Sequence, residues 1–240
     1  MRGSAPTRSG GRARRPRDHV SAGLTWHVVL PSRTQAQLGA RKPQATVEVT
    51  EPVAWSTQVP VPVARALDSH DGDEPESRAE LCHLVSETAR ACCMTRLVDM
   101  LSRREYSCSE ATERLRLDGY LPECAEQTVS RAREGRLIDD GRFAESFVRS
   151  KLSCGWGTPR IERELKRRGV DPSGVLALSE RDSNEGDLER AREMLEGRRL
   201  PERNAYPKLV RYLAGRGYSL DIAKRAASQR LEEASEQGLV

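Results

Sequence analysis

The chain has 240 residues and a formal net charge of +4, and 37% of its residues are hydrophobic, 32% are charged and 4% are aromatic. This composition excludes a large aromatic core and favours small helical units stacked side by side. Strand-forming residues gather only near "HVVL" (27–30) and "TVEVT" (46–50), so the sequence predicts an all-α protein.

The charge is concentrated at the start of the chain. Residues 1–50 contain nine bases and two acids, residues 51–80 contain two bases and seven acids, and residues 81–240 contain 29 bases and 27 acids. We therefore expect a nearly neutral globular part, and weak direct contact with DNA phosphates through the basic N-terminal tail.

No segment has the pattern of a membrane protein. The chain lacks an apolar run of about 18 residues, and its arginine-rich start is not followed by the apolar stretch of a secretory signal. We expect a cytoplasmic protein that makes no membrane contact.

We expect no catalytic residue, cofactor or metal. All four histidines lie within residues 19–83, before the predicted repeats, and no nucleophile stands beside a base. The six cysteines form no C-x-x-C pair, so we expect reduced thiols. A zinc site in the segment 82–93, which holds one histidine and three cysteines, is the weaker alternative, because its spacing matches no common zinc finger.

Residues 1–78 are predicted to be a low-complexity, disordered extension. The segment is rich in Pro, Gly, Ser, Thr, Arg and Gln and has no sustained period of 2 or 3.6 residues, so it buries too little apolar surface to offset the entropy of ordering. "TWHVVL" (25–30) and "TVEVT" could pair as a small hairpin. The long spacer between them argues that such a pair would not persist alone.

Residues 79–236 are predicted to form three tandem three-helix repeats, at about 87–136, 137–183 and 184–235. Each repeat contains a leucine followed four residues later by a glycine, as in Leu115/Gly119, Leu165/Gly169 and Leu213/Gly217. A glycine at this position ends a helix. Repeats of this kind bury a continuous seam between neighbours, so we expect an elongated, curved array.

Local signals in the first repeat predict where its helices begin and end. An apolar stripe from Met94 to Leu101 predicts a helix that ends near Arg104. Ser107 and Glu110 form a capping-box pattern that opens a second helix, and a third begins at residue 122.

The middle repeat carries a local excess of positive charge, with eight bases and five acids in residues 137–170. Only Ile161 and Leu165 of its second helix are expected to face the core. Each of its arginines, taken singly, is explained equally well as part of a solvated face or as a contact residue. Together, Arg160, Arg163 and Arg167 form a strip that is a better candidate for contact with an anionic partner. The predicted partner-binding residues are Arg142, Arg149, Arg160, Arg163, Lys166, Arg167 and Arg168.

Trp156 stands between two glycines, where it can pack between helices or stand exposed as a contact residue. We favour packing, because a large aromatic side chain in a tight joint commonly wedges adjacent helices together.

Three stretches resemble the RecX family of RecA regulators: "LSRREYS" (101–107), "LIDDGRFAESFVRSKL" (137–152) and "GWGTPRIERELKRRGV" (155–170). The resemblance covers residues 95 to about 235. It implies an array of three-helix units that binds along the groove of a RecA nucleoprotein filament and restrains strand exchange, ATP hydrolysis and coprotease activity. It brings no catalytic residues, and we expect a monomer.

The chain departs from the family pattern in three places: the basic N-terminal third, Pro207 near the start of a helix, and Gly141 within "DDGRFA". The first of these leaves the role of the N-terminal segment open.

A helical DNA-binding protein is the alternative, because "ERLRLDGYLPECAEQTV" (113–129) can imitate a helix-turn-helix. A helix that reads a groove concentrates Arg, Lys, Asn or Gln at its start, whereas the second helix here begins with acids. This composition favours the regulator over the DNA reader.

Overall fold

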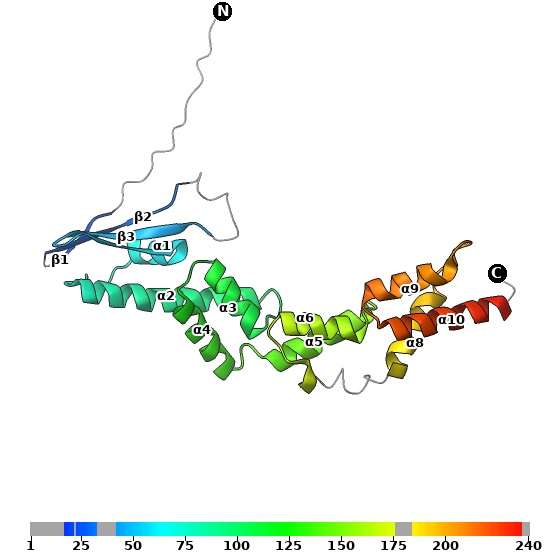
Figure 1. Ribbon diagram of the computed structural model, residues 1–240. Helices are drawn as coiled ribbons and strands as arrows, with labels where there is room; N and C mark the ends of the chain where they lie inside the picture. The colour runs from blue at the N-terminus through cyan, green and yellow to red at the C-terminus, as the bar shows by residue number, and fades with distance from the viewer. Residues whose placement is uncertain (1–16, 22, 33–41, 176–183, 237–240) are drawn as a thin grey trace, which may run out of the picture. The chain divides into compact units, whose positions relative to one another are not determined.

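The computed structural model describes residues 17–21, 23–32, 42–175 and 184–236. The chain divides into two compact units, one of residues 1–96 and 115–125, and one of residues 97–114 and 126–240. Figure 1 shows the order of strands and helices along the chain.

Four strands lie in the first unit: β1 (His19–Ser21), β2 (Leu24–Val29), β3 (Gln44–Glu51) and β4 (Trp55–Pro60). They form an antiparallel meander in the order β1-β2-β3-β4. In its centre, Val28 lies opposite Val47 and Trp26 lies opposite Val49. Helix α1 (Val61–Asp68) follows β4 directly and packs against β2, β3 and β4 (Figure 1).

Alternation of side chains gives this sheet one buried face. Every second residue of β2 and β3 is at most 5% exposed, namely Leu24, Trp26 and Val28 on β2 and Ala45, Val47 and Val49 on β3. Helix α1 covers this face with Val63, Ala64 and Leu67, which are fully buried. Burial of each large apolar side chain stabilises a fold by roughly 1.5–3 kcal/mol, so sheet and helix together form a core.

The predictions of an all-α protein and of disorder in 1–78 are therefore wrong for the described part of that segment. "TWHVVL" and "TVEVT" do pair, within the β2–β3 ladder. The argument from the long spacer failed because the pair is not alone: β1 and β4 extend the sheet, and α1 covers its apolar face. Most of the basic tail falls on residues 1–16 and 33–41, which lie outside the described residues.

The rest of the described chain is helical. The helices are α2 (Arg78–Leu101), α3 (Cys108–Leu117), α4 (Pro122–Glu134), α5 (Asp140–Ser153), α6 (Thr158–Arg167), the short 3-10 helix η2 (Pro172–Gly174), α8 (Asn184–Glu196), α9 (Ala205–Arg216) and α10 (Leu220–Glu236). Pro207 lies in the first turn of α9, which tolerates proline.

The predicted start of α3 is confirmed in part. The Ser107 hydroxyl accepts a hydrogen bond from the amide of Glu110 at 3.1 Å, as an N-cap does. The Glu110 carboxylate pairs with Arg168 at 2.7 Å. The preceding helix α2 ends at Leu101, three residues before the expected Arg104.

Helices α3, α6 and α9 end in the same way. A glycine with positive φ follows each helix, at +100° for Gly119, +73° for Gly169 and +95° for Gly217. Glycine adopts this conformation without strain. The next amide returns to the carbonyl of a buried leucine at 3.0–3.2 Å, from Tyr120 to Leu115, Val170 to Leu165 and Tyr218 to Leu213.

These ends occur at the predicted leucine-glycine positions. The third helix expected in the second repeat falls largely on residues 176–183, which lie outside the described part of the chain. The division into three repeats and its boundaries therefore stay a prediction.

Two apolar clusters stabilise the second unit. One joins α5, α6 and the η2 segment around Val148, Ile161 and Leu165, with Trp156 packed against it. The other joins α8, α9 and α10 around Leu195 and Leu213.

Candidate partner-binding surface

Helix α6 separates apolar from charged residues along its length. Pro159 occupies its first turn, where a missing N–H costs nothing. Ile161 and Leu165 are fully buried, as predicted. The opposite face is charged, which is typical of a helix that packs on one side only.

The preceding helix, α5, begins with a side-chain cap. The Asp139 carboxylate accepts hydrogen bonds from the amides of Arg142 at 3.0 Å and Gly141 at 2.8 Å. These two bonds lower the pKa of Asp139 below its ordinary value. Gly141, which departs from the family pattern, therefore lies inside this cap.

Five of the predicted partner-binding residues are exposed: Arg142, Arg149, Arg163, Lys166 and Arg167. Arg163 donates from Nε to the carbonyl oxygen of Pro159 at 3.1 Å, and Arg167 pairs with Glu164 at 2.6 Å. Hydrogen bonds from Arg167 and then Arg168 lower the pKa of Glu164 to about 2. Exposed contacts within one helix are weak and screened by salt, so a partner can replace them readily.

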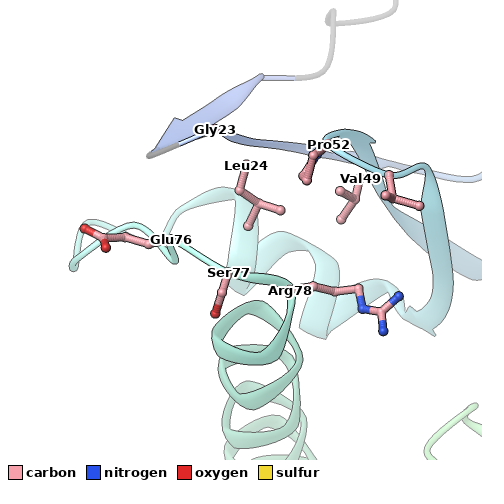
Figure 2. Close-up of a pocket in the computed structure, with 8 residues that line it drawn as sticks. Gly23, Leu24, Val49, Pro52, Glu76, Ser77 and Arg78 are labelled. Atoms are coloured by element: carbon pink, nitrogen blue, oxygen red, sulfur yellow. The ribbon is translucent and has the colours of Figure 1, made fainter.

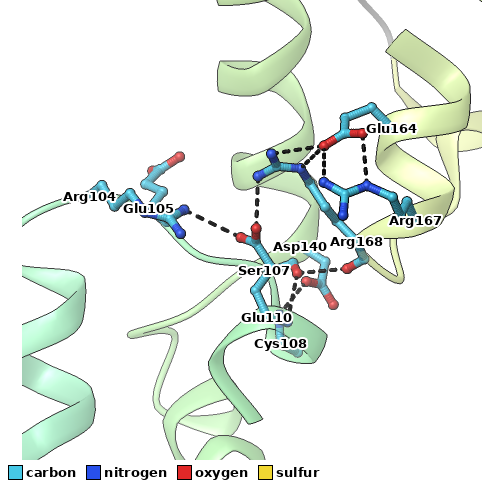
Figure 3. Close-up of polar contacts among 9 residues, drawn as sticks. All are labelled: Arg104, Glu105, Ser107, Cys108, Glu110, Asp140, Glu164, Arg167 and Arg168. Atoms are coloured by element: carbon cyan, nitrogen blue, oxygen red, sulfur yellow. Dashed lines mark hydrogen bonds and ion pairs between the residues drawn. The ribbon is translucent and has the colours of Figure 1, made fainter. Parts of the chain in front are cut away.

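Arg168 is instead built into the fold. Its guanidinium contacts Glu110 at 2.7 Å and Glu164 at 2.9 Å, and its carbonyl oxygen accepts a hydrogen bond from the Ser107 hydroxyl at 2.7 Å (Figure 3). Arg104 approaches the same Glu110 carboxylate at 3.4 Å. Because the side chains of Arg168 and Glu110 are only 22% and 20% exposed, removing one would leave the other poorly solvated.

Arg160 also has a structural role. Its guanidinium lies 3.8 Å from the centre of the Trp156 ring, and it donates to the carbonyl oxygen of Gly215 at 3.1 Å. Trp156 is half-buried against the α5–α6 cluster, so the prediction that it packs is confirmed. The predicted strip of Arg160, Arg163 and Arg167 thus contains two freely exposed residues, not three.

Arg142 has an intermediate position. It pairs with Glu105 at 2.9 Å and donates to the carbonyl oxygen of Leu137 at 3.2 Å, although 54% of its side chain is exposed. The structure therefore divides the seven predicted residues by their partners. Arg142, Arg160 and Arg168 bond to residues outside their own helix. Arg163 and Arg167 bond within α6, and Arg149 and Lys166 are exposed.

A groove of about 410 Å³ beside Arg168 was not predicted. The rings of Phe143 and Phe147 stack in its wall with centroids 5.9 Å apart. Two cations lie near the Phe147 ring, Arg168 at 4.8 Å and Lys151 at 5.3 Å from its centre. The spacing of Phe143, Phe147 and Lys151 at i, i+4 and i+8 could have indicated one stripe of α5.

Comparison with known proteins points to one family. The family model "RecX, second three-helix domain" matches residues 139–173. The regulatory protein RecX of Pseudomonas entomophila is 34% identical over 137 residues, which cover 55% of this chain and 88% of that protein. The regulatory protein RecX of Pseudomonas fluorescens is 36% identical over 136 residues, with 55% and 88% covered. The chain belongs to the RecX family.

Two solved RecX structures share the fold at low identity. The crystal structure of RecX from Lactobacillus salivarius matches with a TM-score of 0.50 and 20% identity, covering 59% of this chain and 96% of that one. A second crystal structure, of regulatory protein RecX, matches with a TM-score of 0.53 and 22% identity, covering 78% and 94%.

The matched RecX segment, 139–173, contains all seven predicted partner-binding residues. Among the residues that the structure describes, no group of three or more His, Cys, Asp or Glu side chains is arranged to hold a metal ion. In the same residues, no helix is long and apolar enough to cross a membrane.

Proposed function

We propose that this RecX-family chain binds RecA and its nucleoprotein filament and modulates RecA, mainly by inhibiting its recombinase, ATPase and coprotease activities in DNA repair and the SOS response. Its relatives are named regulatory protein RecX, which supports a regulatory role for this chain. The observation that supports binding most directly is the exposed positive charge of Arg163, Lys166 and Arg167 on one face of α6.

Positive charge at this place suits a nucleoprotein partner. A filament presents DNA phosphates and acidic side chains, and exposed cations accelerate association with such a surface and fix its orientation. Because the Arg167–Glu164 pair and the Arg163–Pro159 contact are local to α6, binding need not disturb the core.

The test reverses the charge of the three exposed residues on α6 and leaves the fold unchanged. The triple variant Arg163→Glu, Lys166→Glu and Arg167→Glu should raise the concentration needed for half-inhibition of the DNA-dependent ATPase of RecA by at least about tenfold, because attraction becomes repulsion at three positions. Its helicity and melting temperature should match those of the parent, because all three side chains are exposed.

The matched control reverses the charge of three exposed residues in and just before α9. They are Arg203, Lys208 and Arg211. It changes the net charge equally, so it measures the effect of charge alone. Equal inhibition by parent and α6 variant, or equal losses in the two triple variants, would show that the α6 face is not the contact.

A direct DNA-binding function is the second candidate, favoured by the nine bases in residues 1–50. Fluorescence anisotropy with labelled single-stranded and duplex DNA, without RecA, distinguishes the two. Tight binding that survives moderate salt would support the DNA-binding protein, whereas weak binding that falls steeply with salt fits an accessory tail.

A further inference from the structure

Helices α3, α6 and α9 each present their C-terminal end to a segment that precedes them in the chain. Two features recur at all three ends: a backbone carbonyl accepts a hydrogen bond from the earlier segment, and a side chain of that segment lies against the positive-φ glycine. We call these the three end contacts.

The end contact of α9 is made by the start of α6. The amide of Gly157 donates to the carbonyl oxygen of Arg216 at 3.2 Å. A Cβ atom at Gly217 would lie 2.2 Å from Cβ of Arg160, closer than such atoms can approach. Glycine at 217 thus permits both the turn and the close approach of α6.

The end contact of α6 is made by the start of α3. The hydroxyl of Ser107 donates to the carbonyl oxygen of Arg168 at 2.7 Å. A Cβ atom at Gly169 would lie 2.6 Å from Cβ of Ser109. The earlier partner is again the beginning of a helix, and the glycine again faces one of its side chains.

The end contact of α3 has the same parts, but the earlier segment is not a helix. The amide of Lys42, just before β3, donates to the carbonyl oxygen of Leu117 at 3.1 Å. A Cβ atom at Gly119 would lie 1.6 Å from Nε2 of Gln44, the first residue of β3. The accepting carbonyl is two residues before the glycine here and one residue before it at α6 and α9. With this shift, Lys42 and Gln44 take the parts that Ser107 and Ser109 take at α6.

An ion pair strengthens this third contact. The Lys42 ammonium lies 2.9 Å from the Asp118 carboxylate, which also accepts from Arg96 at 2.6 Å. The side chain of Asp118 is only 4% exposed, so these two cations help to compensate a buried charge.

We propose that the sheet-bearing N-terminal segment is a cap that docks through Lys42 and Gln44 onto the end of α3, in the place that a preceding helical repeat would occupy. Arrays of stacked helical units need a different element at their ends, because a terminal unit has no neighbour to cover it. Here Lys42 supplies the hydrogen bond and Gln44 of β3 supplies the side chain, the two parts that the starts of α3 and α6 supply further along. The proposal does not depend on RecA binding.

The test measures amide hydrogen exchange in the full chain. Lys42→Pro removes both the N–H that donates to the carbonyl oxygen of Leu117 and the ammonium that pairs with Asp118. The amides of Gly119 and Tyr120 should then exchange faster, by about two- to tenfold, the change that loss of one hydrogen bond produces. Those of Gly217 and Tyr218, at the end of α9, should be unchanged.

Two further variants keep the result decisive. Lys42→Arg retains the N–H and the charge, so exchange at Gly119 and Tyr120 should match the parent. Asp118→Asn leaves the sheet sequence intact and should speed exchange of the Lys42 amide. If Lys42→Pro disrupts the sheet itself, seen as fast exchange at Val47, the Asp118→Asn result decides. Parent-like exchange at Gly119 in a folded Lys42→Pro chain, or at Lys42 in Asp118→Asn, would overturn the cap.

Discussion

The same kind of helix end contacts different chemical groups in the two units. In the second unit, the ends of α6 and α9 accept hydrogen bonds from the Ser107 hydroxyl and the Gly157 amide. The charged contacts beside them are partly exposed, as in the pair of Arg168 with Glu110. In the first unit, the end of α3 is held by a backbone donor together with a buried carboxylate between Lys42 and Arg96. A shared helix end does not require a shared partner, since only the carbonyl and the glycine have to be matched.

The starts of α3 and α6, which contact the ends of α6 and α9, are themselves capped by carboxylates. Asp140 of α5 accepts a hydrogen bond from the amide of Cys108 at 2.8 Å, and Asp187 of α8 accepts one from the amide of Thr158 at 3.3 Å. A helix further along the chain therefore caps the start of α3 and of α6, so that each of these two helices is bound at both ends. Carboxylates at helix starts are also favoured by the helix dipole.

The largest expected effect lies in the second unit and tests whether its core is independent of the first. Leu165→Ala removes a fully buried side chain at the centre of the α5–α6 cluster. The cavity should lower the free energy of unfolding by roughly 2–5 kcal/mol. Urea unfolding followed by NMR should show early loss of signals from α5 and α6, while those of β2 and β3 persist. Loss of both sets together would mean that the two units unfold as one.

A smaller effect is expected from Asp118→Asn in the first unit. Burial alone would raise the pKa of Asp118, but hydrogen bonds from Lys42 and Arg96 lower it below its ordinary value. Replacing the carboxylate should destabilise the unit by roughly 1.5–3 kcal/mol at neutral pH, the range for a hydrogen bond to a charged group. Thermal unfolding of parent and variant would measure this difference.

The same variant makes a prediction about pH. Because the folded pKa of Asp118 is depressed, its contribution is fully present above the unfolded pKa of about 3.9 and is lost as the pH falls through the folded value. The stability difference between parent and Asp118→Asn should therefore be constant from about pH 5 to 7 and shrink in stronger acid. A difference that grew on acidification would contradict the ion pair.

The sequence predicted local features well and long-range ones poorly. Ser107 as a cap, the glycine ends, and the buried Ile161 and Leu165 of α6 all follow from spacings within one or two turns. Periodicity could not distinguish Arg163 from Arg160, because a residue that faces away from its own core can still pack on another helix, as Arg160 does against Gly215.

The sheet was missed for a related reason. Each of β2 and β3 offers only three buried positions, too few for a strong period-2 pattern, and their stability comes from α1 and from flanking strands. The burial of Asp118 could not be predicted either, because one of the cations that pair with its carboxylate is Lys42, which lies far away in the sequence. Contacts between distant segments decide such cases, and local propensity does not record them.

The smallest expected effects concern two glycines, one in the left-handed turn that ends α3 and one within α9. Gly119 has φ of +100° and faces Gln44, so Gly119→Ala should destabilise the first unit by roughly 1–2 kcal/mol through backbone strain. The clash itself adds little, because the end of the Gln44 side chain can move. Gly215 is the second-last residue of α9, and a Cβ atom there would meet no other atom within 4 Å, so Gly215→Ala should stabilise the second unit by roughly 0.4–1 kcal/mol. Thermal unfolding of the two variants should therefore give shifts of opposite sign. Equal shifts would mean that the end of α3 does not hold its left-handed turn in solution, and the correspondence between the end contacts of α3, α6 and α9 would fail at its first member.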